Sequence, residues 1–200
     1  MKPGELLYDL FMLPLESGSL KKARRELLTG ARGDVLEIGP GTGSNLPVYP
    51  VRNISTLTLL DCRIRDSLRK KAAGFPVQVR MVEGSVESLP FGDGSFDTVV
   101  FTLVFCSVGD PQKGLGELVR VLRPGGRILY MEHVRPEGKS GLLADRLSPA
   151  WCRVSGGCNL NRRTGDLLRR TGLTIHREVR FGRGFFIRGE AALPAEEVEG

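Results

Sequence analysis

The stretch DVLEIGPGTGSN, residues 34–45, decides the fold of this 200-residue chain. Residues 34–39 are a short apolar run of the kind that forms a buried strand. Glycines then recur at Gly39, Gly41 and Gly43, so this part is too glycine-rich for the interior of a strand or a helix. We therefore predict a buried strand that turns through a tight loop into a helix, whose first amide groups can bind a carboxylate or a phosphate.

Strands alternate with helices on the carboxyl side of this stretch. We predict strands at residues 56–61, 77–84, 96–102 and 127–133, with helices at residues 62–74 and 111–122. A polar segment dotted with prolines and glycines then runs to residue 161, and a helix follows at residues 162–171. Strands at residues 173–181 and 184–190 are close enough for an antiparallel hairpin. This order predicts an α/β fold: a Rossmann-like, mostly parallel seven-stranded sheet with helices on both faces and a C-terminal antiparallel hairpin.

The whole chain, residues 1–200, is expected to form a single domain, because its length and its 40% hydrophobic content suit one sheet buried between two helical layers. Within it we expect an N-terminal helical cap at residues 1–33, the Rossmann-like core at residues 34–190 and a mobile tail at residues 191–200. Together with Trp151 and residues 152–161, the cap is expected to shape the acceptor site. Its apolar side chains are Tyr8, Leu10, Phe11, Met12 and Leu13.

Composition limits the partners that the chain is expected to have. The formal net charge is +6, but the lysines and arginines form short clusters without interleaved aromatic residues, which favours solvated helix faces over a nucleic-acid partner. A weak attraction to acidic lipid headgroups at a membrane surface stays open. The four cysteines lack CxxC or metal-finger spacing and the N-terminus resembles no secretory signal, so we expect no metal and a cytoplasmic protein. Residues 6–15 are apolar but too short to span a bilayer.

Two carboxylates indicate the charge of the ligand. The glycine spacing departs from GxGxxG because position 44 is Ser44, and Glu37 stands in the approach to the loop, where it would repel a pyrophosphate and attract an ammonium or a sulfonium group. Asp61 closes the second predicted strand, where an acidic side chain can accept two hydrogen bonds from a ribose diol. The alternative for both residues is helix capping or a surface position. Together they favour a cationic, adenosine-like ligand.

Further segments extend the pattern: LLD at residues 59–61, EGSVESLPF at 83–91, GSFDTVVFTLVFCSV at 94–108, LVRVLRPGGRILYMEHV at 118–134 and GCNLNRRTGDLL at 157–168. With LEIGPGTGSN at residues 36–45, they resemble the UbiE-type class I methyltransferases that use S-adenosylmethionine (SAM). Within these, the sequence is most similar to the methyltransferase-like 7 group, the alkyl thiol S-methyltransferases and their bacterial relatives. TLVFCSV and GGCNL are the more specific segments, whereas the glycine loop and LRPGG occur in many methyltransferases.

The resemblance implies a site for SAM, with S-adenosylhomocysteine as product. Glycines 39, 41 and 43 would cradle the methionine part beside Glu37, Asp61 would hold the ribose hydroxyls, and residues 85–87 would flank the adenine. Many relatives carry an aspartate where this chain has Ser85, so the adenine contact there would have less charge assistance. The full set implied at the cofactor is Glu37, Gly39, Pro40, Gly41, Gly43, Asn45, Asp61, Cys62, Arg63, Ser85, Val86, Glu87, Thr102, Leu103 and Val104.

The expected reaction is methyl transfer to a small, lipophilic acceptor, for which a thiol, a quinone-type ring and a lipid amine all stay open. His133 is the predicted general base, since it stands at the carboxyl end of the fifth strand of the parallel array, with a purely structural histidine as the alternative. Cys106 could border the acceptor or be a small buried hydrophobe. A nucleic-acid methyltransferase and a SAM-binding module without turnover are the competing hypotheses; the first is disfavoured because FTLVFCSV replaces the motif used for flipped bases.

Overall fold

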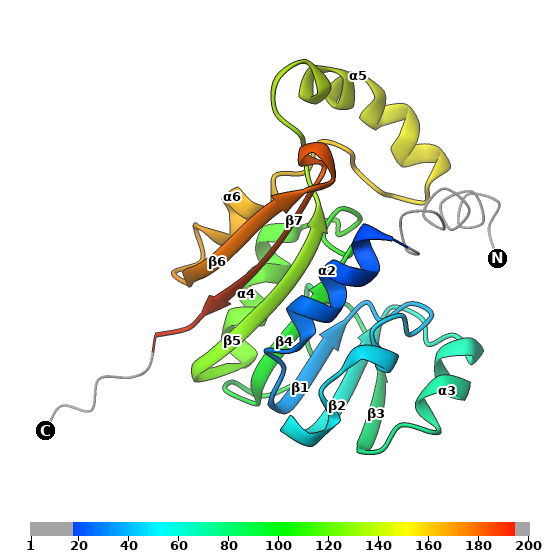
Figure 1. Cartoon of the computed structure of the whole chain (residues 1–200), viewed down its shortest axis with the longest axis vertical. Helices are drawn as coiled ribbons and strands as arrows, with labels where there is room; N and C mark the ends of the chain where they lie inside the picture. The colour runs from blue at the N-terminus through cyan, green and yellow to red at the C-terminus, as the bar shows by residue number, and fades with distance from the viewer. Residues whose placement is uncertain (1–17, 195–200) are drawn as a thin grey trace, which may run out of the picture.

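A computed structural model describes residues 18–194 and places one seven-stranded sheet at the centre of the molecule (Figure 1). The strand order is β3-β2-β1-β4-β5-β7-β6. Strands β3 to β5 are parallel to one another, whereas β7 runs antiparallel to both β5 and β6. The bounds are β1 Gly33–Ile38, β2 Ile54–Asp61, β3 Gln78–Glu83, β4 Phe96–Thr102, β5 Leu122–His133, β6 Thr174–Phe181 and β7 Phe186–Ala192. The predicted fold class is confirmed, including the C-terminal hairpin.

The helices on the carboxyl side of β2 largely follow the predicted pattern, with shorter bounds. The helix predicted directly after the glycine loop is wrong, because only two short 3-10 turns lie between β1 and β2. The helices are α2 Ser19–Leu28, α3 Asp66–Ala72, α4 Pro111–Val121, α5 Gly138–Val154 and α6 Thr164–Leu168, with 3-10 turns at Leu46–Val48, Val51–Asn53 and Gly182–Gly184. Helix α4 begins where Asp110 accepts a hydrogen bond from the amide of Lys113 and Pro111 occupies the first turn. Both residues favour the start of a helix, so the local sequence sets this boundary. No helix within residues 18–194 is long and apolar enough to cross a membrane.

Two hydrophobic clusters cover the two faces of the sheet. On one face, Leu115 and Leu118 of α4 are buried together with Phe101 and Tyr130 of the central strands. On the other face, α2 buries Leu20, which packs in a cluster with residues of β4 and β5. Full burial of such a side chain contributes about 1.5–3 kcal/mol, so the central strands are the rigid part of the molecule.

The predicted N-terminal cap is seen only in its last part. Helix α2 lies within residues 1–33, and its apolar side chains pack on the sheet near β5 and β7. The five cap side chains predicted to be apolar cover, Tyr8 to Leu13, lie outside the described residues. The last strand, β7, continues to Ala192, two residues beyond the predicted strand end and into the stretch expected to be a mobile tail.

Helix α5 is the main difference from the predicted pattern. It spans 17 residues in the segment for which no regular element was expected, and it lies beyond the carboxyl end of β5 instead of on a face of the sheet (Figure 1). Gly138, Gly141 and Pro149 gave this segment the composition of a loop. Gly141 is nevertheless required, because a Cβ there would approach the carbonyl oxygen of Pro136 to 2.3 Å. Gly141 therefore allows close packing at the start of the helix. In the sequence, such a glycine cannot be distinguished from one that ends a helix.

Candidate active site

A cavity of about 510 Å³ opens at the carboxyl ends of β1, β2 and β4, the edge at which open parallel sheets bind their ligands. Nine of the residues that the sequence predicted at the cofactor line it: Gly39, Gly41, Asp61, Cys62, Ser85, Val86, Glu87, Leu103 and Val104. Residues that were not predicted at the cofactor complete the wall, among them Thr42, Arg65, Cys106, Ser107, Ser155, Gly156 and Cys158. The structure therefore brings segments that are far apart in the sequence to one cavity.

The glycine loop has the backbone shape that only glycine adopts easily. Gly39, Gly41 and Gly43 have φ angles of +62°, +56° and +78°. A Cβ at Gly39 would come within 2.6 Å of the Val104 side chain, whereas one at Gly41 would meet open space at the cavity. Gly43 packs against side chains behind the loop and does not line the cavity. The loop thus presents bare backbone to whatever fills this end of the cavity.

Asp61 fastens this loop to the end of β2. Its Oδ2 accepts a hydrogen bond from the amide of Gly41 at 3.1 Å, and its Oδ1 accepts one from the amide of Arg63 at 3.2 Å. Among the lining residues the charged side chains are Asp61, Glu87 and Arg65, so carboxylates outnumber the single guanidinium. This balance favours a cationic ligand over a pyrophosphate.

The wall formed by residues 85–87 is held from two sides. The hydroxyl of Ser85 accepts a hydrogen bond from the amide of Glu87 at 3.1 Å, which closes a small turn. The carboxylate of Glu87 in turn accepts one from the amide of Asp110 at 3.0 Å. The side chain of Ser85 is therefore engaged within its own turn, and Glu87 joins the turn to the start of α4.

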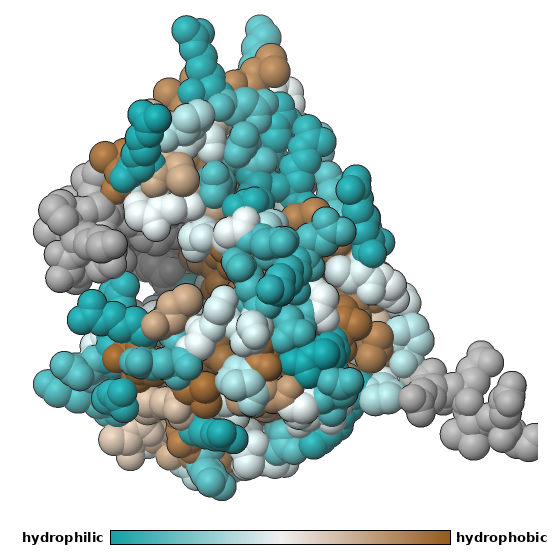
Figure 2. Space-filling view, turned by 180° about the vertical axis from the view of Figure 1, so that it is seen from behind, coloured by the Kyte–Doolittle hydropathy of each residue, from teal (hydrophilic) through white to brown (hydrophobic). Residues whose placement is uncertain are grey.

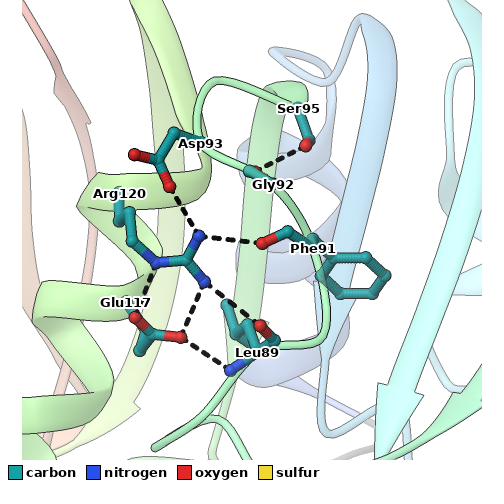
Figure 3. A network of polar contacts seen from close by, with 7 residues as sticks. All are labelled: Leu89, Phe91, Gly92, Asp93, Ser95, Glu117 and Arg120. Carbon is teal, nitrogen blue, oxygen red and sulfur yellow. Dashed lines mark hydrogen bonds and ion pairs between the residues drawn. The ribbon is translucent and has the colours of Figure 1, made fainter.

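An ion-pair network fixes the segment that follows this wall (Figure 3). Glu117 accepts a hydrogen bond from the amide of Leu89 at 2.7 Å, and Arg120 donates to the carbonyl oxygens of Leu89 and Phe91. Arg120 also pairs with Asp93 and with Glu117, each at 2.7 Å. The hydrogen bonds from Arg120 lower the pKa of Glu117 to about 2. Side chains of α4 thus hydrogen-bond to the backbone on both sides of residue 90 and stabilise the segment that follows the 85–87 wall.

Glu37 does not reach the cavity wall. Its side chain is 1% exposed, and its two oxygens accept hydrogen bonds from Asn45 Nδ2 at 2.8 Å and from the hydroxyl of Tyr49 at 2.9 Å. Arg24 of α2 donates to the amide oxygen of Asn45 at 2.7 Å and to the hydroxyl of Thr102 at 3.3 Å. Burial raises the pKa of Glu37 to about 7. The predicted residues that do not line the cavity are Glu37, Pro40, Gly43, Asn45, Arg63 and Thr102.

Glu132, which was not predicted, shapes the cavity floor. It is fully buried, and its Oε1 accepts hydrogen bonds from the amides of Val104 at 2.8 Å and Phe105 at 3.1 Å, just after Leu103 with its φ of +60°. Its Oε2 has no partner within the described part of the chain, and burial raises the pKa of the carboxyl to about 8. An acidic residue near the end of an apolar strand was the signal that could have revealed it.

Two thiols, those of Cys106 and Cys158, also line the cavity. Cys106 follows β4, Cys158 follows α5, and their side chains are hydrogen-bonded to each other. The amide of Asn159 donates to the carbonyl oxygen of Cys106 at 2.8 Å, which holds the two segments together. The shared hydrogen bond lowers the pKa of Cys158 and raises that of Cys106, which burial also raises. Of the stretch 151–161 that the sequence predicted at the acceptor site, Ser155, Gly156 and Cys158 line the cavity, whereas Trp151 does not.

His133 lies away from the cavity. Neighbouring residues of a strand point to opposite faces, and Glu132 faces the loop after β4. His133 packs against Phe185 and Phe186, with ring centroids 6.2 Å and 5.6 Å away. Burial lowers its pKa to about 4, so the ring is neutral but weakly basic. This position does not favour His133 as the general base.

Comparisons with known proteins agree with this geometry. A family model described as "Methyltransferase domain" matches residues 36–130. The chain is 36% identical to the thiol S-methyltransferase TMT1B of Rattus norvegicus over 173 residues, which are 78% of this chain and 71% of the relative. It is 43% identical to the demethylmenaquinone methyltransferase of Thermus thermophilus over 76 residues, 38% of this chain and 34% of that protein. A methyltransferase structure from Mesorhizobium loti superposes with a TM-score of 0.70 at 18% identity, covering 88% and 99% of the two chains.

Proposed function

Because the chain belongs to the class I SAM-dependent methyltransferases, we propose that it transfers a methyl group from this cofactor to the sulfur of a small lipophilic thiol. One observation carries the proposal: a single cavity is lined by the bare glycine loop and Asp61, which we take as the cofactor end, and by Val108, Ser155 and Cys158, which we take as the acceptor end, with Leu103 and Val104 on its floor. A donor and an acceptor could therefore meet in one cavity. The similarity to thiol S-methyltransferases across most of the chain supports sulfur as the acceptor atom.

The cofactor end has the features that SAM requires. The backbone at Gly39 and Gly41 would accommodate the methionine part without a side chain in the way, and the carboxylate of Asp61 would accept hydrogen bonds from the ribose diol. The segment from Ser85 to Glu87 would flank the adenine. Glu37 would act through Asn45 and Tyr49, which support the loop from behind, and not by direct contact.

The residues at the acceptor end would mainly position the thiol and exclude water. Bound SAM supplies a methyl group that its sulfonium already activates, so the rate depends on an in-line approach within a dry cavity. Leu103 and Val104 form the floor, and Glu132 holds that floor rigid through two amide hydrogen bonds. A free thiol of pKa about 8.5 is only a few per cent ionised at neutral pH, so we expect the rate to rise with pH over this range.

A comparison of acceptors tests the proposal. Formation of S-adenosylhomocysteine would be measured with a graded series of alkyl and aryl thiols, with quinols, with phosphatidylethanolamine and with RNA and DNA. We expect turnover with lipophilic thiols and a methyl thioether as product, identified by mass spectrometry. Turnover with quinols alone would replace the thiol by a quinone-type ring, the substrate class named for the Thermus relative. SAM binding without any product would instead support a binding module.

A further inference from the structure

Helix α5 carries an apolar surface that is unlike the rest of the described molecule. The large hydrophobic side chains that stand exposed within residues 18–194 are Leu142, Leu143, Leu147 and Val154, at 66%, 57%, 48% and 48% of their full accessible area. All four belong to α5. Figure 2 shows hydrophobic side chains standing among hydrophilic ones at the top of the molecule, the end at which Figure 1 places this helix. Exposed apolar residues that are scattered singly over a surface need no partner, but the gathering of these four on one helix indicates an interaction surface.

The exposed side of α5 combines two stripes. At about 100° per residue, Leu143, Leu147 and Val154 fall within about 40° of one another around the helix. Lys139, Arg146 and Arg153 form a parallel stripe directly beside them, and all three are exposed. The inward side is made of small buried residues, namely Gly141, Ala144 and Ser148. The helix is therefore amphipathic in the opposite sense to a core helix, with its bulky apolar residues facing out.

The charge on this surface is of one sign. The single acidic residue of α5 is Asp145, which points to the other side of the helix and pairs with Arg135 at 2.7 Å. The exposed stripe of Lys139, Arg146 and Arg153 therefore has cations without a carboxylate between them. Centres of protein interfaces are depleted of charge, whereas leucines bordered by lysine and arginine suit a lipid surface, where the cationic heads reach phosphate groups and the apolar side chains enter the acyl boundary.

We propose that the exposed side of α5 docks this protein on an anionic phospholipid surface. The helix ends at Val154, and the next residues, Ser155, Gly156 and Cys158, line the cavity. Docking would therefore place the acceptor end of the cavity against the bilayer. If the proposed methylation of lipophilic thiols holds, the acceptor would pass from the membrane into the cavity without crossing water.

Co-sedimentation of the full chain with vesicles tests the docking. The probes are vesicles of phosphatidylcholine alone and vesicles that also contain phosphatidylglycerol. We expect binding to the anionic vesicles, a loss of about tenfold or more in the variant Leu143→Ser/Leu147→Ser, and a similar loss in Lys139→Gln/Arg146→Gln, since each cation near the surface strengthens binding about fivefold. The matched control is Arg69→Gln/Lys70→Gln, which removes the same number of exposed charges from α3. It should bind nearly as well as the parent.

Three results would overturn the docking. These are no binding by the parent chain, equal losses in the α3 and α5 charge variants, and light scattering that shows a dimer which the leucine variant dissociates, because a second copy would then occupy the surface. Circular dichroism of each variant establishes that it is folded. Methylation of a water-soluble thiol without vesicles separates the two proposals: the α5 variants should keep that activity, and its absence in the parent would count against the thiol reaction and not against docking.

Discussion

The two ends of the cavity are built in different ways. At the cofactor end, the glycine loop and Asp61 continue directly from β1 and β2, which are hydrogen-bonded to each other along their length. At the acceptor end, residues 155–158 follow a helix that lies beyond the sheet and are tied back by the contacts of Asn159 with Cys106. The sheet thus positions the proposed donor site directly, whereas the proposed acceptor wall depends on contacts made outside the sheet.

The largest effect is expected at Glu132. This residue of β5 holds the loop after β4, which lines the cavity, in place. Glu132→Ala leaves the amides of Val104 and Phe105 without their acceptor, and each buried unpaired amide costs about 1–3 kcal/mol. We expect the free energy of unfolding to fall by about 2–4 kcal/mol in urea denaturation. Substitutions of surface residues usually change stability by less than about 0.5 kcal/mol. A loss of that size in Glu132→Ala would show that the carboxyl does not hold this loop.

Glu132→Gln is the matched variant, because it keeps an oxygen that can accept both amides. Folding raises the pKa of this carboxyl from 4.5 to about 8, so its contribution to stability is fully present below pH 4.5 and is lost as the pH rises through about 8. The parent should therefore lose stability relative to Glu132→Gln as the pH rises from about 4.5 to about 8, and the difference should level off above pH 8. Parallel pH curves for the two proteins would contradict the raised pKa.

At the cofactor end, Asp61→Ala should weaken SAM binding by about 1–3 kcal/mol, which is about 5- to 150-fold, through the lost ribose hydrogen bonds. Isothermal titration calorimetry measures the change. Asp166→Ala is the control, since Asp166 is an exposed carboxylate of α6 that does not line the cavity. Equal affinities for Asp61→Ala and the parent would remove Asp61 from the cofactor site.

A smaller effect is expected from the clamp beneath the 85–87 wall. Folding lowers the pKa of Glu117 from 4.5 to about 2, so this carboxylate stabilises the fold above pH 4.5 and ceases to do so as the pH falls through about 2. Allowing for solvent screening, Glu117→Gln should cost about 1 kcal/mol at pH 7, and the cost should shrink on acidification. Thermal unfolding of both proteins between pH 2 and pH 7 checks this convergence; a gap that stays constant would mean that charge plays no part.

The sequence predicted the cofactor end better than the acceptor end, for a physical reason. Glycines with positive φ and an acid at a strand end are local requirements, so Gly39, Gly41 and Asp61 could be placed on the cavity in advance. The burial of Glu37 could not, because its partners Asn45 and Tyr49 lie beyond the loop, and Asn45 is held in turn by Arg24 from a helix before the first strand. Helix α5 was missed because Gly141, which the close packing at its start requires, resembles a helix breaker in the sequence, and because its leucines face outward instead of following the periodicity of a core helix.

The smallest effect is expected at His133, where the predicted base and the observed position disagree. Loss of a general base usually slows a reaction about 10²- to 10⁴-fold, whereas a residue that packs against Phe185 and Phe186 away from the cavity should change kcat/KM for a thiol less than about twofold when replaced by asparagine. The pH profile separates the two roles. With its pKa lowered to about 4, His133 is already neutral above pH 5, so any rise in rate from pH 6 to pH 9 would belong to the acceptor thiol and should survive in His133→Asn. If the variant instead loses that rise together with most of its activity, while SAM affinity is retained, the ring must reach the acceptor in the working enzyme, and the wall beside β5 must rearrange when the cavity fills.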